Sequence, residues 1–197
     1  MNYLFFDIET TGLARSSAIL QFSGILCDEN LDIIKVINTY YYAPFPVPSS
    51  AAAIHGLTMQ KLEFLAECDF EEGADEIYDL LTQPNLTLVG HNIKSYDLQV
   101  LKYNLEAVGY DINPDDLIVY DTLIEARQRY SGKHNLESAL NKFLAENGNT
   151  LEDIKALFLN VPELIEKCPQ TETKLHSALF DSFCVYCLYT FLTNGNS

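Results

Sequence analysis

The N-terminal segment of the chain joins a strongly apolar run to two acidic residues. Residues 3–8 (YLFFDI) have the composition of a buried central strand, and Asp7 and Glu9 occupy alternate positions at its end. Side chains alternate along a strand, so both carboxylates are expected to project to the same side. Surface strands often carry two acids, but acids at the exit of so apolar a strand are poorly explained as a solvated face. The segment therefore predicts two oxygen ligands that converge on one ion.

Further reactive residues lie in two later segments. Asp97 ends the run GHNIKSYD, while His176 and Asp181 bound the run HSALFD. Carboxylates drawn from both ends and the middle of a chain repel one another, so a fold tolerates their cluster mainly when divalent cations neutralise it. We therefore expect these carboxylates to converge with Asp7 and Glu9 on a metal site.

The spacing of His176 and Asp181 constrains how they reach one site. Five residues along an ideal helix turn through about 500°, which leaves two side chains about 140° apart around the axis. We therefore expect His176 on the entering loop or first turn, and Asp181 inside the helix facing the sheet. An imidazole with a pKa near 6.5 can accept a proton from water near neutral pH, which is the task of a general base. The alternative is a helix-initial histidine with a solvent role.

The hydrophobic periodicity is strand-like at the front of the chain and mostly helical from residue 122 onward. Strands are expected at 3–8, 18–27, 33–43, 87–91 and 117–121. Helix start signals occur at Asp69 and Thr150. A leucine stripe from Leu98 to Leu105 has helical spacing, which places Asp97 in the first turn of a helix or just before it.

Length and composition predict one soluble domain. At 197 residues and 48% hydrophobic residues, the chain is long enough for one well-buried domain and short for two, so we assign residues 1–197 to a single domain. The N-terminus lacks the basic and apolar regions of a secretory signal, and no apolar run approaches the roughly 18 residues of a membrane span. A cytoplasmic protein with no membrane partner is expected. Its five scattered cysteines are typical of reduced core residues.

The acidic segments resemble, in order, the three motifs of the DEDDh 3′-to-5′ exonuclease family, which includes proofreading and single-strand exonucleases. The matching runs are FFDIETTGL, VGHNIKSYDLQVL and KLHSALFDSFCVY, and IHGLT (54–58) resembles the loop that often lies between the first two. The resemblance covers nearly the whole chain. A sister group carries tyrosine four residues before its last aspartate, where this chain has Ser177, so the histidine class is favoured.

The resemblance implies a fold and a set of roles. The fold is an α/β, ribonuclease H-like one, with a mixed five-stranded sheet whose first three strands are antiparallel and whose faces are flanked by helices. By the same resemblance two Mg²⁺ or Mn²⁺ ions are held, and the ligands are Asp7, Glu9, Asp97 and Asp181. His176 would activate the attacking water. Such ions bind the attacking and leaving oxygens of an in-line displacement.

The resemblance also implies a substrate. A 3′-to-5′ exonuclease hydrolyses phosphodiester bonds from the 3′ end of single-stranded nucleic acid and releases nucleoside 5′-monophosphates, with DNA favoured and RNA an alternative. Thr10 and His55 are implied contacts of the terminal nucleotide. Leu13 is either a wedge against a base or a core residue, and the core is the expectation.

The charge balance limits how such an enzyme holds its substrate. Twelve basic and twenty-eight acidic residues give a formal net charge of −16, and so negative a chain should bind long polyanions poorly. We expect it to bind only a short terminal segment of the nucleic acid, or to rely on the basic surface of a polymerase or another protein partner. The cations near one another or near the acidic motifs are Arg127, Arg129 and Lys133, and Arg15, Lys94 and Lys174. Arg127 and Arg129 equally suit a helix C-terminus.

Two alternatives to the exonuclease stay open. One is a non-catalytic module that keeps the fold and binds a nucleic-acid end or a polymerase. All five reactive positions are present, which disfavours it. The other is an endonuclease of the ribonuclease H type, which also uses four acids. Residues 147–173 form a longer insertion than compact family members require, and we expect helices beside the site there.

Overall fold

A single mixed sheet forms the centre of the protein. The structure is a computed structural model that describes residues 1–168 and 173–194. The strands lie in the order β3-β2-β1-β4-β5. They are β1 (Asn2–Thr10), β2 (Ile19–Cys27), β3 (Ile33–Tyr40), β4 (Leu86–Gly90) and β5 (Ile118–Asp121). The first three pair antiparallel, while β4 runs parallel to β1 and β5 parallel to β4. The predicted fold class is confirmed.

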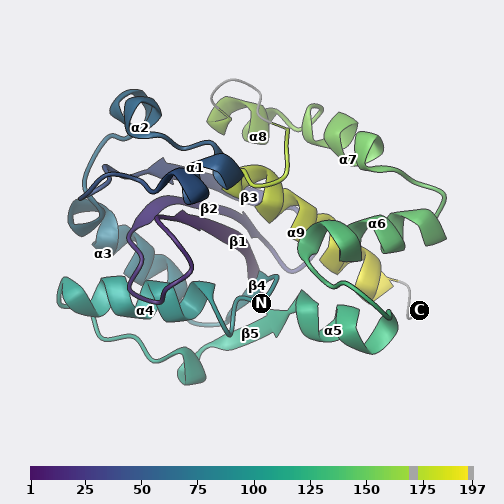
Figure 1. The fold of residues 1–197 in the computed structure, drawn as a ribbon. Helices are drawn as coiled ribbons and strands as arrows, with labels where there is room; N and C mark the ends of the chain where they lie inside the picture. The colour runs from purple at the N-terminus through teal and green to yellow at the C-terminus, as the bar shows by residue number, and fades with distance from the viewer. Residues whose placement is uncertain (169–172, 195–197) are drawn as a thin grey trace.

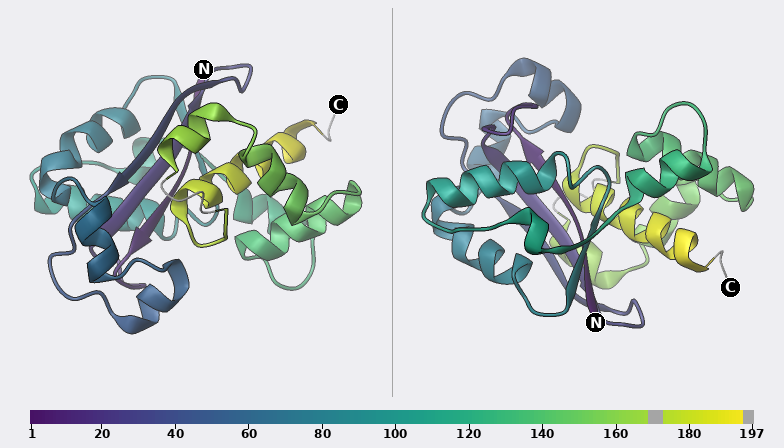
Figure 2. Two further views of the ribbon diagram at one scale, coloured as in Figure 1. Left: turned by 90° about the horizontal axis from the view of Figure 1, so that it is seen from above. Right: turned by 90° about the horizontal axis from the view of Figure 1, so that it is seen from below.

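Helices cover both faces of the sheet, as Figures 1 and 2 show. The longer ones are α3 (Phe70–Leu81), α4 (Asp97–Ala107), α6 (Leu136–Glu146) and α9 (Ala178–Asn194). The shorter ones are α1 (Ser49–His55), α2 (Met59–Leu65), α5 (Thr122–Arg129), α7 (Leu151–Phe158), α8 (Pro162–Lys167) and the 3₁₀ turn η1 (Pro114–Asp116). α3 and α4 pack on one face, and α9 packs on the other with α5, α6 and α7 against it.

The alternation of β1 decides which face receives its acids. Leu4 and Phe6 join the core beneath α3 and α4, whereas Phe5 joins the core beneath α9. Asp7 and Glu9 continue the series of Phe5, because side chains two residues apart share a face. The two acids therefore project toward α9.

Local signals in the sequence set several helix ends. Asp69 and Thr150 each form a capping box with the acid three residues later, so both predicted helix starts are confirmed. α4 begins at Asp97, within the predicted range. The segment 147–173 contains α7 and α8, which pack against α9 and β3 respectively, and its residues 169–172 lie outside the described part. That it is an insertion, and that 1–197 is one exonuclease domain, stay predictions.

A close contact fixes the loop that leads to Asp97. A Cβ atom at Gly90 would lie 1.8 Å from Cγ2 of Ile93 and 3.2 Å from the Phe6 carbonyl oxygen. Glycine is required there because the loop turns back against the central strand. The loop is thus held on β1 just before the first residue of α4.

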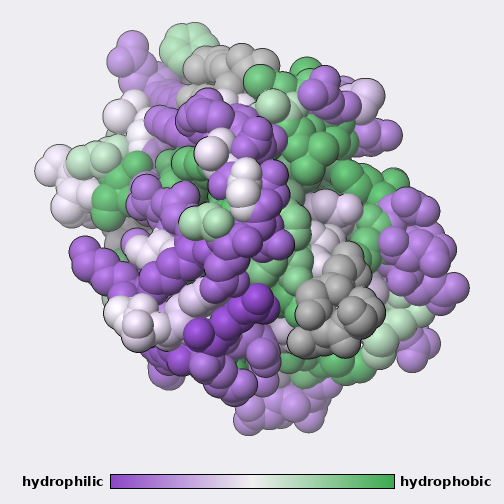
Figure 3. Space-filling view, turned by 90° about the vertical axis from the view of Figure 1, so that its right-hand side faces the viewer, coloured by the Kyte–Doolittle hydropathy of each residue, from purple (hydrophilic) through white to green (hydrophobic). Residues whose placement is uncertain are grey.

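Other expectations concern surface and core. Among the described helices, none is long and apolar enough to cross a bilayer. The five cysteines are free and four of them are buried, which agrees with reduced core residues. Figure 3 shows the face that carries α5 to α7, where apolar residues reach the surface between hydrophilic ones. This face is therefore not uniformly hydrophilic, despite the net charge of the chain.

Candidate active site

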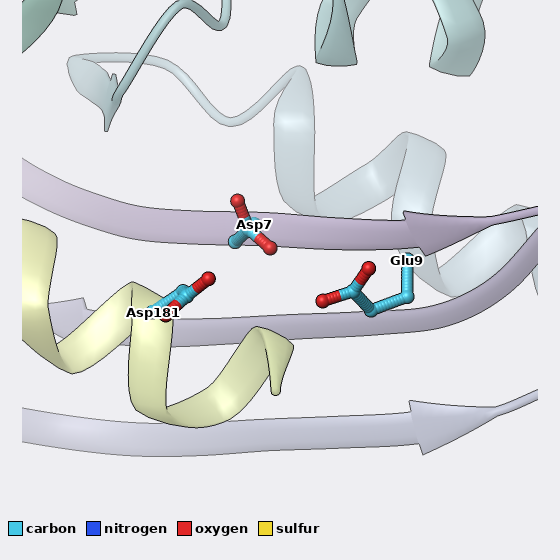
Figure 4. A group of neighbouring side chains, drawn as sticks. All are labelled: Asp7, Glu9 and Asp181. Carbon is cyan, nitrogen blue, oxygen red and sulfur yellow. The ribbon is translucent and has the colours of Figure 1, made fainter. Parts of the chain in front are cut away.

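Three carboxylates from the two ends of the chain converge between β1 and α9. Asp7 and Glu9 come from the last part of β1, and Asp181 comes from the first turn of α9. One oxygen atom of each lies within 4.8 Å of the others. Figure 4 shows the three groups pointing toward one another in the space between strand and helix. The structure thus brings together residues that are more than 170 positions apart.

One carboxylate oxygen of Asp181 accepts a hydrogen bond, and the other has no partner among the described residues. It is 7% exposed, and its Oδ2 accepts a hydrogen bond from the His176 backbone N–H at 3.1 Å. Its Oδ1 is buried and has no hydrogen-bond partner among the described residues. A buried carboxylate oxygen without a donor is costly unless a cation binds it.

Asp97 lies beside this group rather than within it. It is 4% exposed, and a hydrogen bond from the backbone of Ile8 holds its carboxylate against β1. Its charge acts on both Asp7 and Glu9. Asp97, the fourth predicted acid, therefore interacts electrostatically with the cluster, although it is not one of the three mutually close carboxylates.

The four carboxylates are poorly suited to carry charge without a cation. Asp97 and Asp181 are buried, and Asp7 and Glu9 are half-buried. Burial raises the pKa of Asp7 and of Glu9 well above the usual values, and repulsion from neighbouring carboxylates adds to the effect. Burial also raises the pKa of Asp97 and of Asp181 to about 7, against opposing backbone hydrogen bonds. Hard oxygen ligands of this kind suit Mg²⁺ and Mn²⁺. The residues present therefore fit divalent cations.

His176 lies in the bend before α9, as its spacing from Asp181 predicts. Its backbone is left-handed, with φ of 66°, and its side chain is exposed. This conformation turns the N–H of His176 toward Asp181 while leaving the imidazole accessible to solvent. Its role as a base stays a prediction.

A cavity of about 380 Å³ adjoins Glu9. Thr10 and His55 both line it, together with Leu13, Ile54 and Tyr96. The hydroxyl groups of Thr10 and Tyr96 lie 2.7 Å apart, and each donates to the Gly12 carbonyl at 2.6 Å. The cavity wall on this side is therefore braced by its own hydrogen bonds.

The His55 ring is fixed in one protonation state by its partners. Its Nδ1 accepts from the Leu57 N–H at 3.0 Å, and its Nε2 faces the Thr10 carbonyl at 3.2 Å. A neutral ring with its proton on Nε2 satisfies both contacts. Burial lowers the pKa of His55, which favours the same neutral state.

The expectation that Leu13 fills the core is wrong. Its side chain is 88% exposed at the mouth of the cavity, and Ile54 beside it is 55% exposed. The chain leaves β1 at Thr10 and continues into a loop, and Leu13 projects from this loop without entering the core.

Two residues near the site were not predicted. Tyr96 precedes Asp97 and braces the cavity wall, and the only signal for it is an aromatic residue beside a candidate ligand. Asp121 ends β5 and accepts hydrogen bonds from the backbone N–H groups of Asn92, Lys94 and Leu123, at 2.8, 3.3 and 3.0 Å. An aspartate between a strand and a helix is a typical N-cap signal. Asp121 thus ties the loop before Asp97 to the start of α5.

The raised pKa values predict a pH-dependent stability of the metal-free protein. Asp181 has a folded-state pKa of about 7 against an ordinary value of 3.8, so its stabilising contribution is present below about pH 4 and is lost as the pH rises through about 7. In EDTA, Asp181→Asn should gain stability relative to the wild type between about pH 5 and about pH 8, by up to about 4 kcal/mol. Urea unfolding at several pH values measures this difference.

His55 and His91 have lowered pKa values, so their contribution changes with pH in the opposite direction. Both histidines are present in the two proteins, and the difference between variant and wild type removes their effect. Adding Mg²⁺ or Mn²⁺ at about pH 8 should stabilise the wild type more than Asp181→Asn. A pH-independent difference, or equal stabilisation of both proteins by the metal, would contradict the prediction.

Comparisons with known proteins agree with the fold and identify a family. The sequence profile of the exonuclease family (RNase_T) matches residues 4–189. Exodeoxyribonuclease I of Buchnera aphidicola subsp. Schizaphis graminum is 32% identical over an alignment of 109 positions, which covers 52% of this chain and 22% of that protein. The DNA polymerase III subunit epsilon of Haemophilus influenzae is 25% identical over an alignment of 202 positions, which covers 97% of this chain and 67% of that protein.

Solved structures show the same fold. A structure of exonuclease I superposes with a TM-score of 0.76 at 19% identity and covers 98% of this chain. Escherichia coli exonuclease I in complex with a dA16 oligonucleotide gives a TM-score of 0.70 at 20% identity, again over 98% of this chain. The chain spans 41% of each of these two proteins. With a profile match that extends over nearly its whole length, the chain belongs to the exonuclease family.

Proposed function

We propose that the chain is a metal-dependent 3′-to-5′ exonuclease that acts on single-stranded nucleic acid, with DNA favoured over RNA. The observation that carries the proposal is the carboxylate cluster of half-buried Asp7 and Glu9 with buried Asp181, whose Oδ1 has no hydrogen-bond partner among the described residues. Family membership supports it, as do the relatives named exodeoxyribonuclease I and DNA polymerase III subunit epsilon. Similar structures hold dA16 and dT13 oligonucleotides.

The acids would act as the metal ligands. Two Mg²⁺ or Mn²⁺ ions would be held by Asp7, Glu9, Asp97 and Asp181. When bound, such ions neutralise the negative charge that builds up on a phosphodiester during hydrolysis. The protein contributes the rigid placement of the ligands, because β1 lies at the centre of the sheet and α9 packs directly on it.

His176 would accept the proton of the attacking water. The water oxygen bonds to phosphorus, the bond from phosphorus to the O3′ of the penultimate nucleotide breaks, and that O3′ takes up a proton. The terminal residue then leaves as a nucleoside 5′-monophosphate, and the shortened strand keeps a free 3′ hydroxyl. The exposed ring on the bend before α9 leaves the imidazole room to receive the proton and release it to solvent.

The cavity beside Glu9 would hold the terminal nucleotide. Leu13 and Ile54 offer exposed apolar surface at its mouth, which suits contact with the face of a base regardless of base identity. Thr10 and His55 would form its floor. Their polar side-chain atoms already have partners within the protein, so they would shape the cavity rather than read the base.

The net charge of −16 favours a short grip on a strand end over binding along a long strand. A polymerase or another basic protein partner would extend that grip, and a cytoplasmic location stays the expectation. The alternative function is a non-catalytic module that binds nucleic-acid ends or a polymerase. The same assay separates the two.

An end-labelled strand tests activity and direction. With a 5′-labelled single strand and Mg²⁺, the wild type should give a ladder that shortens from the 3′ end and release nucleoside 5′-monophosphates. Asp7→Asn should be slower by about 10³-fold, because several kcal/mol of charge stabilisation are lost with a ligand. The exposed Asp75→Asn, on α3, is the matched control and should keep wild-type activity.

Two outcomes would contradict this prediction. Absence of degradation by the wild type would favour the binding module. Cleavage of a circular or 3′-blocked strand would favour an endonuclease.

The role of His176 is tested best with asparagine. Asparagine tolerates the left-handed backbone at this position, so His176→Asn should preserve the N–H contact to Asp181. The variant should lose about 10²- to 10⁴-fold in kcat with little change in KM, because a general base contributes that much. It should also lose the part of the pH–rate profile that reports on an imidazole. An unchanged kcat would show that His176 is not the base.

A further inference from the structure

A second hollow, of about 390 Å³, lies between the loop after β4, helix α5 and the start of α6. We call it the Arg127 hollow. The residues that line it are mostly polar or basic, in contrast to the apolar mouth of the cavity beside Glu9. They include His91, Asn92, Arg127, His134 and Asn135.

Two acidic residues next to the lining of the Arg127 hollow, Asp121 and Glu137, interact with proposed metal ligands. Its loop continues to Asp97, and Asp121, which binds that loop, acts electrostatically on Asp97. At the start of α6, Glu137 follows a lining residue of the hollow and acts electrostatically on Asp181. Residues next to the hollow therefore act electrostatically on two of the four proposed ligands.

The two hollows lie on different sides of α9. Figure 1 shows α1, which lines the cavity beside Glu9, to the left of α9, and the pair α5 and α6 to its right. The view from above in Figure 2 keeps that order. The elements that line the two hollows thus lie on opposite sides of α9, whose first turn carries Asp181.

Arg127 differs from its neighbour Arg129 in how its charge is used. Arg129 donates to the Glu146 carboxylate at 3.2 Å, and its guanidinium lies over the Phe143 ring, 5.2 Å from the centroid. In the described part of the chain, Arg127 has neither an acidic partner within ion-pair distance nor a hydrogen bond from its guanidinium. Both residues are exposed in the last turn of α5, so both serve the helix dipole equally. Of these two arginines, Arg127 is the one whose charge is available for a ligand.

Among the other polar groups of the hollow, the Asn135 amide offers a further donor, whereas the His91 ring does not. The His91 ring is engaged at both nitrogens, by the Thr122 hydroxyl at 2.9 Å and by the His134 carbonyl at 2.6 Å. The Asn135 side chain accepts from the Ser138 N–H through its Oδ1, which leaves its amide N–H₂ group directed away from that contact. A guanidinium beside an amide donor suits a phosphate group.

We propose that the Arg127 hollow binds a backbone phosphate of the substrate strand, on the 5′ side of the bond that is cut. The proposal rests on the proposed exonuclease function, whose terminal nucleotide occupies the other cavity. It gives a strongly acidic chain one local contact to the strand. Arg127 supplies the charge, and the loop and α6 supply the neutral walls.

Substrate length and a matched pair of arginines test the proposal. Rates are measured on a single strand of about 12 nucleotides and on a dinucleotide without a 5′ phosphate, whose only phosphate is the one cut. Arg127→Ala should lower kcat/KM on the longer strand about 10-fold, mainly through KM, because a charged hydrogen bond of about 1.5 kcal/mol is lost. It should stay within about twofold of the wild type on the dinucleotide. The salt dependence on the longer strand should weaken by about 0.7 in slope.

Arg129→Ala is the control. It removes a charge from the same turn of α5, and this charge is already paired with Glu146. It should match the wild type on both substrates within about twofold. Equal losses for the two variants, or a loss for Arg127→Ala that is the same on both substrates, would overturn the proposal. If the wild type cuts neither substrate, the exonuclease function fails, and fluorescence anisotropy of the labelled longer strand with the same variants still decides whether Arg127 binds it.

Discussion

Repulsion among closely spaced carboxylates is the interaction around which the rest of this structure is arranged. Asp7 and Glu9, which are half-buried, and Asp181, which is buried, place oxygen atoms within 4.8 Å of one another, and Asp97 adds a fourth charge. Such a cluster opposes folding unless protons or cations neutralise it. The scaffold that holds it is correspondingly rigid, with the central strand of the sheet on one side and the packed start of α9 on the other.

The protein has two hollows of different chemical character that are proposed to contact the substrate. On the side of α1, exposed apolar side chains and a hydrogen-bonded wall form a cavity suited to a nucleotide. On the side of α5, the hollow is polar and holds an unpaired guanidinium. The first is lined in part by Glu9 of the cluster, and the two hollows share no lining residue. In the proposed function, the chain compensates for its net negative charge by concentrating a few favourable contacts around a strand end.

Periodicity and spacing predict the cluster well, because they are local rules with few exceptions. The alternation of β1 sends Asp7 and Glu9 to the side of Phe5, and the five-residue spacing before α9 separates His176 from Asp181. Features that depend on tertiary contacts were less accessible. Leu13 has an apolar side chain, yet it is exposed on the loop after β1. The paired state of Arg129 depends on Glu146, which lies in a different helix, so the sequence alone could not separate it from Arg127.

The most direct test of the central claim is a crystal structure of the protein with Mn²⁺, with the ions located by their anomalous scattering. Two ions should lie among the carboxylates, one of them bound by Asp181 through its otherwise unpartnered Oδ1. A structure in which the carboxylates bind no Mn²⁺ at saturating concentration, or in which Asp181 Oδ1 takes no part in binding, would contradict the claim that divalent cations neutralise this cluster.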